Sequence, residues 1–174
     1  MPAQILTTIP ESGKYQEFSF GEKFNSVCHI LFNTNDNDEW LGHFAKKHES
    51  GFSGVVTNTA NNVALVVAGG QGYLINTESK VLLPQLYNFS NLESLLKTNN
   101  PDFFLVGACY KILVFDFEGN LNVVEPDFPI DGIYFKEQQG NYALGMLDAP
   151  MNQYKAPYTF KMDLTTFEII IKST

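Results

Sequence analysis

The chain has 174 residues, of which 44% are hydrophobic, 14% aromatic and only 17% charged, enough for one domain with a packed core. Its net charge is −8, and its 11 basic residues are all lysines. Nucleic-acid binding needs a basic surface, and arginine is the preferred contact to phosphate and guanine, so direct binding to nucleic acid is excluded. An acidic chain of this kind instead attracts basic partners.

The start of the chain, residues 1–12, has neither the basic stretch nor the apolar stretch of a secretory signal. No apolar run approaches the roughly 20 residues of a membrane helix. Cys28 and Cys109 are far apart in the sequence and are interpreted as buried thiols, with a single disulfide left open as the alternative. We therefore expect a cytoplasmic protein with no membrane contact.

Residues 33–39 form the densest polar segment of the chain. Their alternating oxygen side chains are similar to a calcium loop, but the glycine at the sixth position and the glutamate at the twelfth are absent. The segment is interpreted either as a solvated loop or as an acidic probe for a cationic cleft. Trp40 follows directly, and it is interpreted either as an interface anchor or as a core residue.

Sequence motifs of catalysis or of metal binding are absent from the chain. Cys28 and His29 are neighbours, so on a strand they point to opposite faces, and His43 and His48 are spaced for neither a strand nor a helix site. Residues 69–72 (GGQG) lack the full spacing of a phosphate-binding turn and predict a hairpin turn. We expect a protein that is not an enzyme and that uses neither a cofactor nor a metal.

A repeat of 40 residues runs through most of the chain. Shifting the sequence by 40 places residues 63–66 over 103–106 and residues 73–76 over 113–116, without gaps. A third copy begins at residue 133, and residues 148–158 interrupt it as an insertion. Short apolar runs that end at Gly, Asn or Asp are strand signals, and polar residues at strand ends start turns. Such residues are Asn76, Asp116 and Asp163.

Four short strands per 40-residue unit are typical of propeller blades. The sequence therefore predicts an all-β single domain, 1–174, with an N-terminal β segment and partial repeat at 1–52 and blade-like antiparallel repeats at 53–92, 93–132 and 133–174. Three blades and a partial one predict an open, half-propeller-like arc, and a closed four-bladed propeller is the alternative. Residues 88–98 carry Ser90 three residues before Glu93, the spacing of a capping box, and predict one or two helical turns. Residues 39–47 stay ambiguous between helix and strand.

The insertion at 148–158 is a second candidate surface, because insertions in repeat proteins often carry binding. A tolerated loop is the other interpretation. Its tyrosines and methionine are adaptable contact residues. The residues predicted to bind a partner, from both segments, are Asp36, Asp38, Glu39, Trp40, Asp148, Met151, Tyr154 and Tyr158.

Size, acidity and incomplete blade repeats such as FFLVGACYKILVFDFEGNLNVV (103–124) give the chain a resemblance to the small immunity proteins of bacterial contact-dependent growth inhibition. In particular it resembles the half-propeller type that neutralises a ribonuclease toxin of the pancreatic-ribonuclease fold. The resemblance implies a tight one-to-one complex with a basic toxin domain, whose active-site cleft the chain blocks. The alternatives are a self-associating β-repeat scaffold or protein-interaction module, with homodimerisation, and, with least support, a ligand-binding or enzymatic propeller.

Overall fold

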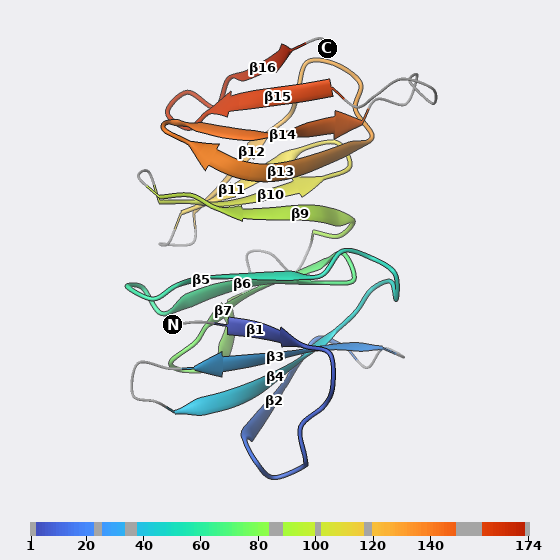
Figure 1. Ribbon diagram of the computed structural model, residues 1–174, viewed down its shortest axis with the longest axis vertical. Helices are drawn as coiled ribbons and strands as arrows, with labels where there is room; N and C mark the ends of the chain where they lie inside the picture. The colour runs from blue at the N-terminus through green and yellow to red at the C-terminus, as the bar shows by residue number, and fades with distance from the viewer. Residues whose placement is uncertain are drawn as a thin grey trace. The chain divides into compact units, whose positions relative to one another are not determined.

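A computed structural model describes residues 3–22, 26–33, 38–83, 89–99, 102–116, 120–148 and 158–172. Within these ranges, sixteen β-strands form four four-stranded sheets, and neither a helix nor a closed barrel occurs (Figure 1). The prediction of an all-β protein is confirmed. The chain divides into two compact units, Met1–Leu92 and Glu93–Thr174. The prediction of a single domain stays a prediction.

The N-terminal unit contains two sheets. The first has the strand order β1-β3-β4-β2 and consists of β1 (Ala3–Leu6), β2 (Gln16–Phe20), β3 (Val27–Asn33) and β4 (Glu39–Ala45). Its β2 lies parallel to β4, whereas its other two strand pairs are antiparallel. The second sheet runs in sequence order and consists of β5 (Gly54–Asn58), β6 (Val63–Ala68), β7 (Gln71–Asn76) and β8 (Val81–Leu83).

Two further sheets follow, and both have their strands in sequence order. The third sheet consists of β9 (Leu92–Lys97), β10 (Phe104–Ala108), β11 (Ile112–Phe115) and β12 (Leu121–Val124). The fourth consists of β13 (Gly132–Gln139), β14 (Tyr142–Asp148), β15 (Tyr158–Asp163) and β16 (Ile169–Lys172). To within one residue, the second, third and fourth sheets each fall inside one of the predicted repeats, 53–92, 93–132 and 133–174. That the sheets are blades of a propeller stays a prediction.

The polar residues at strand ends start turns, as the sequence predicts. Asn76 Oδ1 accepts hydrogen bonds from the backbone N–H groups of Glu78 and Ser79 at 3.1 and 2.8 Å. Asp163 Oδ1 accepts one from the Thr165 N–H at 2.7 Å, and Asp116 Oδ1 accepts one from the Asn120 N–H at 2.8 Å. These bonds replace the strand ladder where each strand ends, so the side chains fix where the chain turns.

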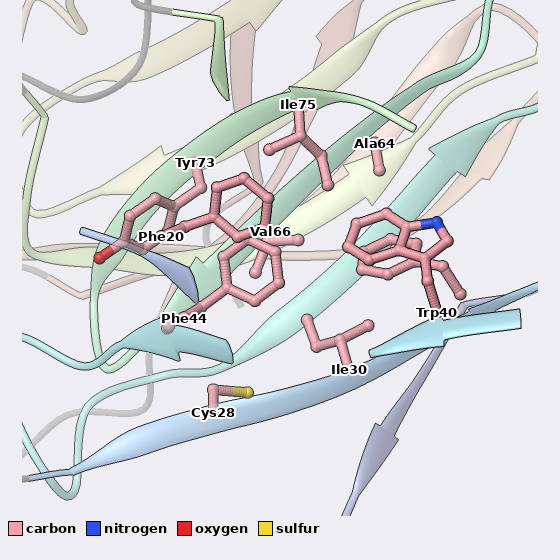
Figure 2. Close-up of a cluster of buried hydrophobic side chains, with 11 residues drawn as sticks. Phe20, Cys28, Ile30, Trp40, Phe44, Ala64, Val66, Tyr73 and Ile75 are labelled. Atoms are coloured by element: carbon pink, nitrogen blue, oxygen red, sulfur yellow. The ribbon is translucent and has the colours of Figure 1, made fainter. Parts of the chain in front are cut away.

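Each unit has an apolar core between two sheets. In the N-terminal unit, side chains from the first and second sheets converge (Figure 2). Phe20 stacks on Phe44 at 4.8 Å between ring centroids, and the Tyr73 hydroxyl donates a buried hydrogen bond of 2.7 Å to the Ala45 carbonyl. In the C-terminal unit, the third and fourth sheets bury ten residues between them. These are Leu105, Ile112, Val114, Ile130, Ile133, Ala143, Leu147, Phe160, Met162 and Leu164.

The prediction of helical turns at 88–98 is wrong, because residues 92–97 form strand β9. Asn91 lies between the two residues of the expected capping box, and its φ of 60° is incompatible with a continuous right-handed helix. Pairing with β10 then outweighs the local capping signal. The ambiguous segment at 39–47 contributes strand β4. No helix able to cross a membrane is found among the described residues.

Candidate partner-binding site

The described part of the first acidic segment already has local partners for its charges. Asp38 is 62% exposed, and its Oδ2 lies 3.4 Å from Lys80 Nζ. That ammonium group also donates a 2.8 Å hydrogen bond to Gln16 Oε1. Glu39 Oε1 accepts a weak hydrogen bond from Asn33 Nδ2 at 3.4 Å. The Lys80 ammonium offsets part of the negative charge that this segment presents, and Asp36 lies outside the described residues.

Trp40 lies in the core of the N-terminal unit, with none of its surface exposed. Its ring stacks on Phe32 at 4.2 Å and meets Phe18 edge-on at 5.6 Å. Because the indole is enclosed, it offers no surface to a partner in this conformation. The placement fits the alternative interpretation of Trp40 as a core residue.

The second predicted surface begins at the end of β14. Asp148 is exposed there, and its backbone carbonyl accepts a 2.8 Å hydrogen bond from the Asp131 N–H. Tyr158 starts β15 opposite Leu147 and is partly buried. Met151 and Tyr154 lie outside the described residues. The structure therefore brings the predicted Asp148 next to a second carboxylate, Asp131.

A third carboxylate, Glu93 of β9, belongs to the same end of the C-terminal unit. The Cys109 thiol donates a 3.4 Å hydrogen bond to Glu93 Oε1. Gly132 leaves the room for this arrangement, because a Cβ atom there would lie 2.7 Å from the Tyr134 hydroxyl and 2.9 Å from Glu93 Oε2. Glu93 Oε2 is itself buried, beside the Tyr134 hydroxyl and without a well-formed hydrogen bond. We call this group the Glu93 cluster; it consists of Glu93, Cys109, Asp131, Tyr134 and Asp148.

Within the Glu93 cluster, the pKa values of Glu93, Cys109 and Tyr134 are raised, which favours their protonated forms. Burial raises the pKa of Glu93, and the nearby Asp131 charge adds to this, against hydrogen bonds that lower it. Burial also raises the pKa of Cys109, followed by the Glu93 charge. Burial, then Glu93 and Asp148, raise the pKa of Tyr134 to about 12. The thiol and phenol therefore stay protonated at neutral pH, which favours a cation-attracting surface over a nucleophilic site.

Sequence reasoning missed Glu93 because it lay in an expected helix. The repeat period was the signal in the sequence that could have identified Glu93 as part of the site. Ser94 Oγ donates a 2.7 Å hydrogen bond to the Ile133 carbonyl, and these two residues are 39 apart. Residues about one period apart therefore meet between the third and fourth sheets, which places Glu93 near Asp131 and Gly132.

A pair of histidines was also missed, because only their sequence neighbours were considered. His29 of β3 and His43 of β4 are directly opposite in the hairpin, and their Nδ1 atoms are 2.8 Å apart. The sequence signal is the polar segment 33–39, whose middle residue, Asp36, is seven positions from each histidine along the chain. Among the described residues, no cluster of three or more His, Cys, Asp or Glu side chains is arranged to hold a metal ion.

No known family model matches this chain, and no characterised protein matches its sequence at a significant level. The resemblance to immunity proteins therefore stays a prediction. So does the prediction that the chain is not an enzyme.

Glu93→Gln should stabilise the fold at about pH 7, by less than about 1 kcal/mol because Glu93 keeps part of its contact with solvent. The pKa of Glu93 is higher in the folded chain than its ordinary value of 4.5, so folding favours the protonated form. The protonated carboxyl contributes its full stabilisation of the fold at pH values below the ordinary pKa. That stabilisation is lost as pH rises through the pKa of the folded chain. Glutamine does not ionise, so the Glu93→Gln chain keeps this stabilisation at neutral pH.

Urea denaturation of both chains at several pH values measures the effect. The stability gain of Glu93→Gln should vanish below about pH 4. Glu168→Gln, at an exposed position of the same unit, is the matched control. A gain that does not depend on pH would contradict the assignment of the effect to the Glu93 charge.

Proposed function

We propose that this chain is an immunity protein that binds a basic toxin domain, a ribonuclease in the first instance, and blocks its active-site cleft. The observation that carries the proposal is the Glu93 cluster, which gathers three carboxylates at one end of the C-terminal unit. Neither of the two ion pairs found among the described residues involves them. Asp131 and Asp148 are exposed, so their charge is available to a cationic partner, in a chain whose net charge is −8.

A ribonuclease cleft is cationic because it holds phosphate groups. Carboxylates placed against such a cleft imitate the phosphate charge, and the long-range attraction raises the rate of association. Tyr110 follows Cys109 directly and is 66% exposed, so an aromatic side chain suited to anchoring an interface stands beside the acidic groups. Inhibition then needs only coverage of the cleft and no reaction by this chain.

The finer architecture is part of the same proposal. We propose that the four sheets are blades of an open half-propeller-like arc, with a closed four-bladed propeller as the alternative. The second, third and fourth sheets support this, since each is an antiparallel four-stranded meander occupying about one repeat period. A cytoplasmic location is proposed with the function, because the toxin's RNA substrate is there.

A second candidate function, a self-associating β-repeat scaffold, is favoured by strand β16. Among the described strands, β16 pairs only with β15, and Ile170 and Ile171 are 39% and 37% exposed. An edge strand with exposed apolar side chains and no proline is a template for pairing with a second chain. This function predicts a stable homodimer with no toxin present.

Co-expression with any toxin-like domain that the adjacent gene encodes separates the two functions. The immunity proposal expects a one-to-one complex that survives size-exclusion chromatography, with mass measured by light scattering. The chain alone should then be monomeric. A homodimer that does not bind the toxin domain would overturn the immunity proposal in favour of the scaffold.

A further inference from the structure

An open cavity of about 810 Å³ lies among three turns of the C-terminal unit. The turn between β9 and β10 contributes Phe103, the turn between β13 and β14 contributes Asn141, and the turn between β15 and β16 contributes Phe167. The volume is within the range of small-ligand pockets, roughly 300–1,000 Å³. Members of the Glu93 cluster do not line this cavity, so it is a separate candidate site.

Hydrogen bonds tie the three turns to one another. Gln138 Nε2 donates to the Asn99 carbonyl at 2.9 Å, which joins the turn before β10 to the end of β13. Asn141 joins the second turn to the third, because its Nδ2 donates to Asp163 Oδ1 at 3.1 Å and to Thr165 Oγ1 at 2.9 Å. The walls of the cavity are therefore held in place before a ligand arrives, which lowers the entropic cost of binding.

Phe167 has a backbone conformation that is unfavourable for a bulky residue. Its φ is 59°, in the left-handed region that glycine and asparagine adopt most readily. Strained residues of this kind cluster at sites that hold ligands. The Phe167 ring contacts the Phe103 ring, with 5.7 Å between centroids, and both side chains are only partly buried. Packing within the unit therefore leaves part of each aromatic surface at the cavity for a ligand.

The polar groups at the cavity are neutral. The described residues that line it carry no charge. Thr165 Oγ1 accepts a hydrogen bond from Asn141, so its own hydrogen is free to point elsewhere, and the Asn99 side chain offers both a donor and an acceptor. The nearest carboxylate, Asp163, is held in the turn, where its Oδ1 also accepts the Thr165 N–H at 2.7 Å.

Aromatic surface beside neutral hydroxyl and amide groups suits a sugar. The C–H face of a sugar ring packs against an aromatic ring, while the hydroxyl groups around its edge exchange hydrogen bonds with amides and hydroxyls. A nucleotide fits less well, because bases stack on flat, open aromatic faces. Here the two rings are tilted by 59° against each other, and the net charge of −8 repels phosphate groups.

We propose that this cavity binds a neutral sugar, which packs one face against Phe167 and places its hydroxyl groups near Asn99, Asn141 and Thr165. The proposed site is independent of the Glu93 cluster and of the proposed immunity function. Because the cavity is open and has no charged contact to offer, the dissociation constant for a monosaccharide should be on the order of 1 mM.

NMR titration of the full chain with glucose, galactose, mannose and N-acetylglucosamine tests the site. The backbone signals of Asn141, Thr165 and Phe167 should shift in a saturable way with at least one of these sugars. Phe167→Leu should weaken that binding by about 10-fold. Phe128→Leu is the matched control, because Phe128 packs against the same core outside the cavity, and it should bind as the unchanged chain does. Unchanged binding in Phe167→Leu would overturn the proposal.

A second measurement does not depend on the folding of the variants. In the unchanged chain, saturation of the aromatic protons should transfer to the C–H protons of the bound sugar. Adenosine, a planar ligand without phosphate, should bind more weakly than the sugar. The absence of a saturable shift with all four sugars, or tighter binding of adenosine, would overturn the site.

Discussion

Replacing Asp131 and Asp148 together by lysine should weaken the complex with the basic partner by about 100-fold. Both side chains are exposed, so the change should alter the free energy of unfolding by less than about 0.5 kcal/mol. In the complex, it places ammonium groups against a cationic cleft, and such like-charge contacts cost several kcal/mol. About 2.8 kcal/mol corresponds to 100-fold in the dissociation constant.

Surface plasmon resonance at two salt concentrations measures this effect. The association rate of the unchanged chain should fall as salt rises, and the lysine variant should lose most of that dependence. The control carries the same change of charge at Asp102 and Glu168, two exposed positions of the same unit. An equal loss of affinity in the control would mean that only total charge matters and that the Glu93 cluster is not the binding site.

The first acidic segment offers the competing location. Reversing Asp36, Asp38 and Glu39 to lysine tests it, and the sequence alone predicts a strong loss of binding at low salt. Because Asp38 is already paired with Lys80, we expect a smaller loss than at the Glu93 cluster. A larger loss in this variant than in the Asp131 and Asp148 variant would move the interface to the N-terminal unit.

Trp40→Ala should destabilise the fold by about 3–5 kcal/mol, the usual cost of removing a buried aromatic side chain. The indole is fully buried, stacks on Phe32, and contacts Phe18 and Phe20. Its removal leaves a cavity between aromatic rings that the two sheets cannot close without moving. Urea denaturation, monitored by circular dichroism, measures the loss.

The same variant separates the two interpretations of Trp40. If the residue acts only in the core, the folded fraction should bind the partner with unchanged affinity. Trp40→Phe keeps an aromatic ring at the position and should recover much of the lost stability. A large loss of affinity with little loss of stability would instead show that Trp40 contacts the partner directly.

Local signals in the sequence were sufficient for much of the fold. The side chains of Asn76, Asp116 and Asp163 bind the backbone within a few residues, so their turns could be located without knowledge of distant contacts. Apolar runs bounded by such residues then located most of the strands. The parallel pairing of β2 with β4 gave no local signal, since it joins residues more than twenty positions apart.

The candidate site was less predictable, because it depends on which sheets adjoin. Asp148 was identified from charge and from its place at the start of an insertion. Glu93 was missed because the local capping-box spacing pointed to a helix, whereas the positive φ of Asn91 and pairing with β10 make a strand. His29 and His43 were missed because hairpin register, rather than distance along the sequence, brings them together.

Cleavage of RNA by any toxin-like domain that the adjacent gene encodes, titrated with the purified chain, tests the central claim most directly. We predict that cleavage stops at a one-to-one ratio, and that the Asp131 and Asp148 lysine variant restores it at the same ratio. Undiminished cleavage in the presence of excess, folded chain would contradict the proposed immunity function.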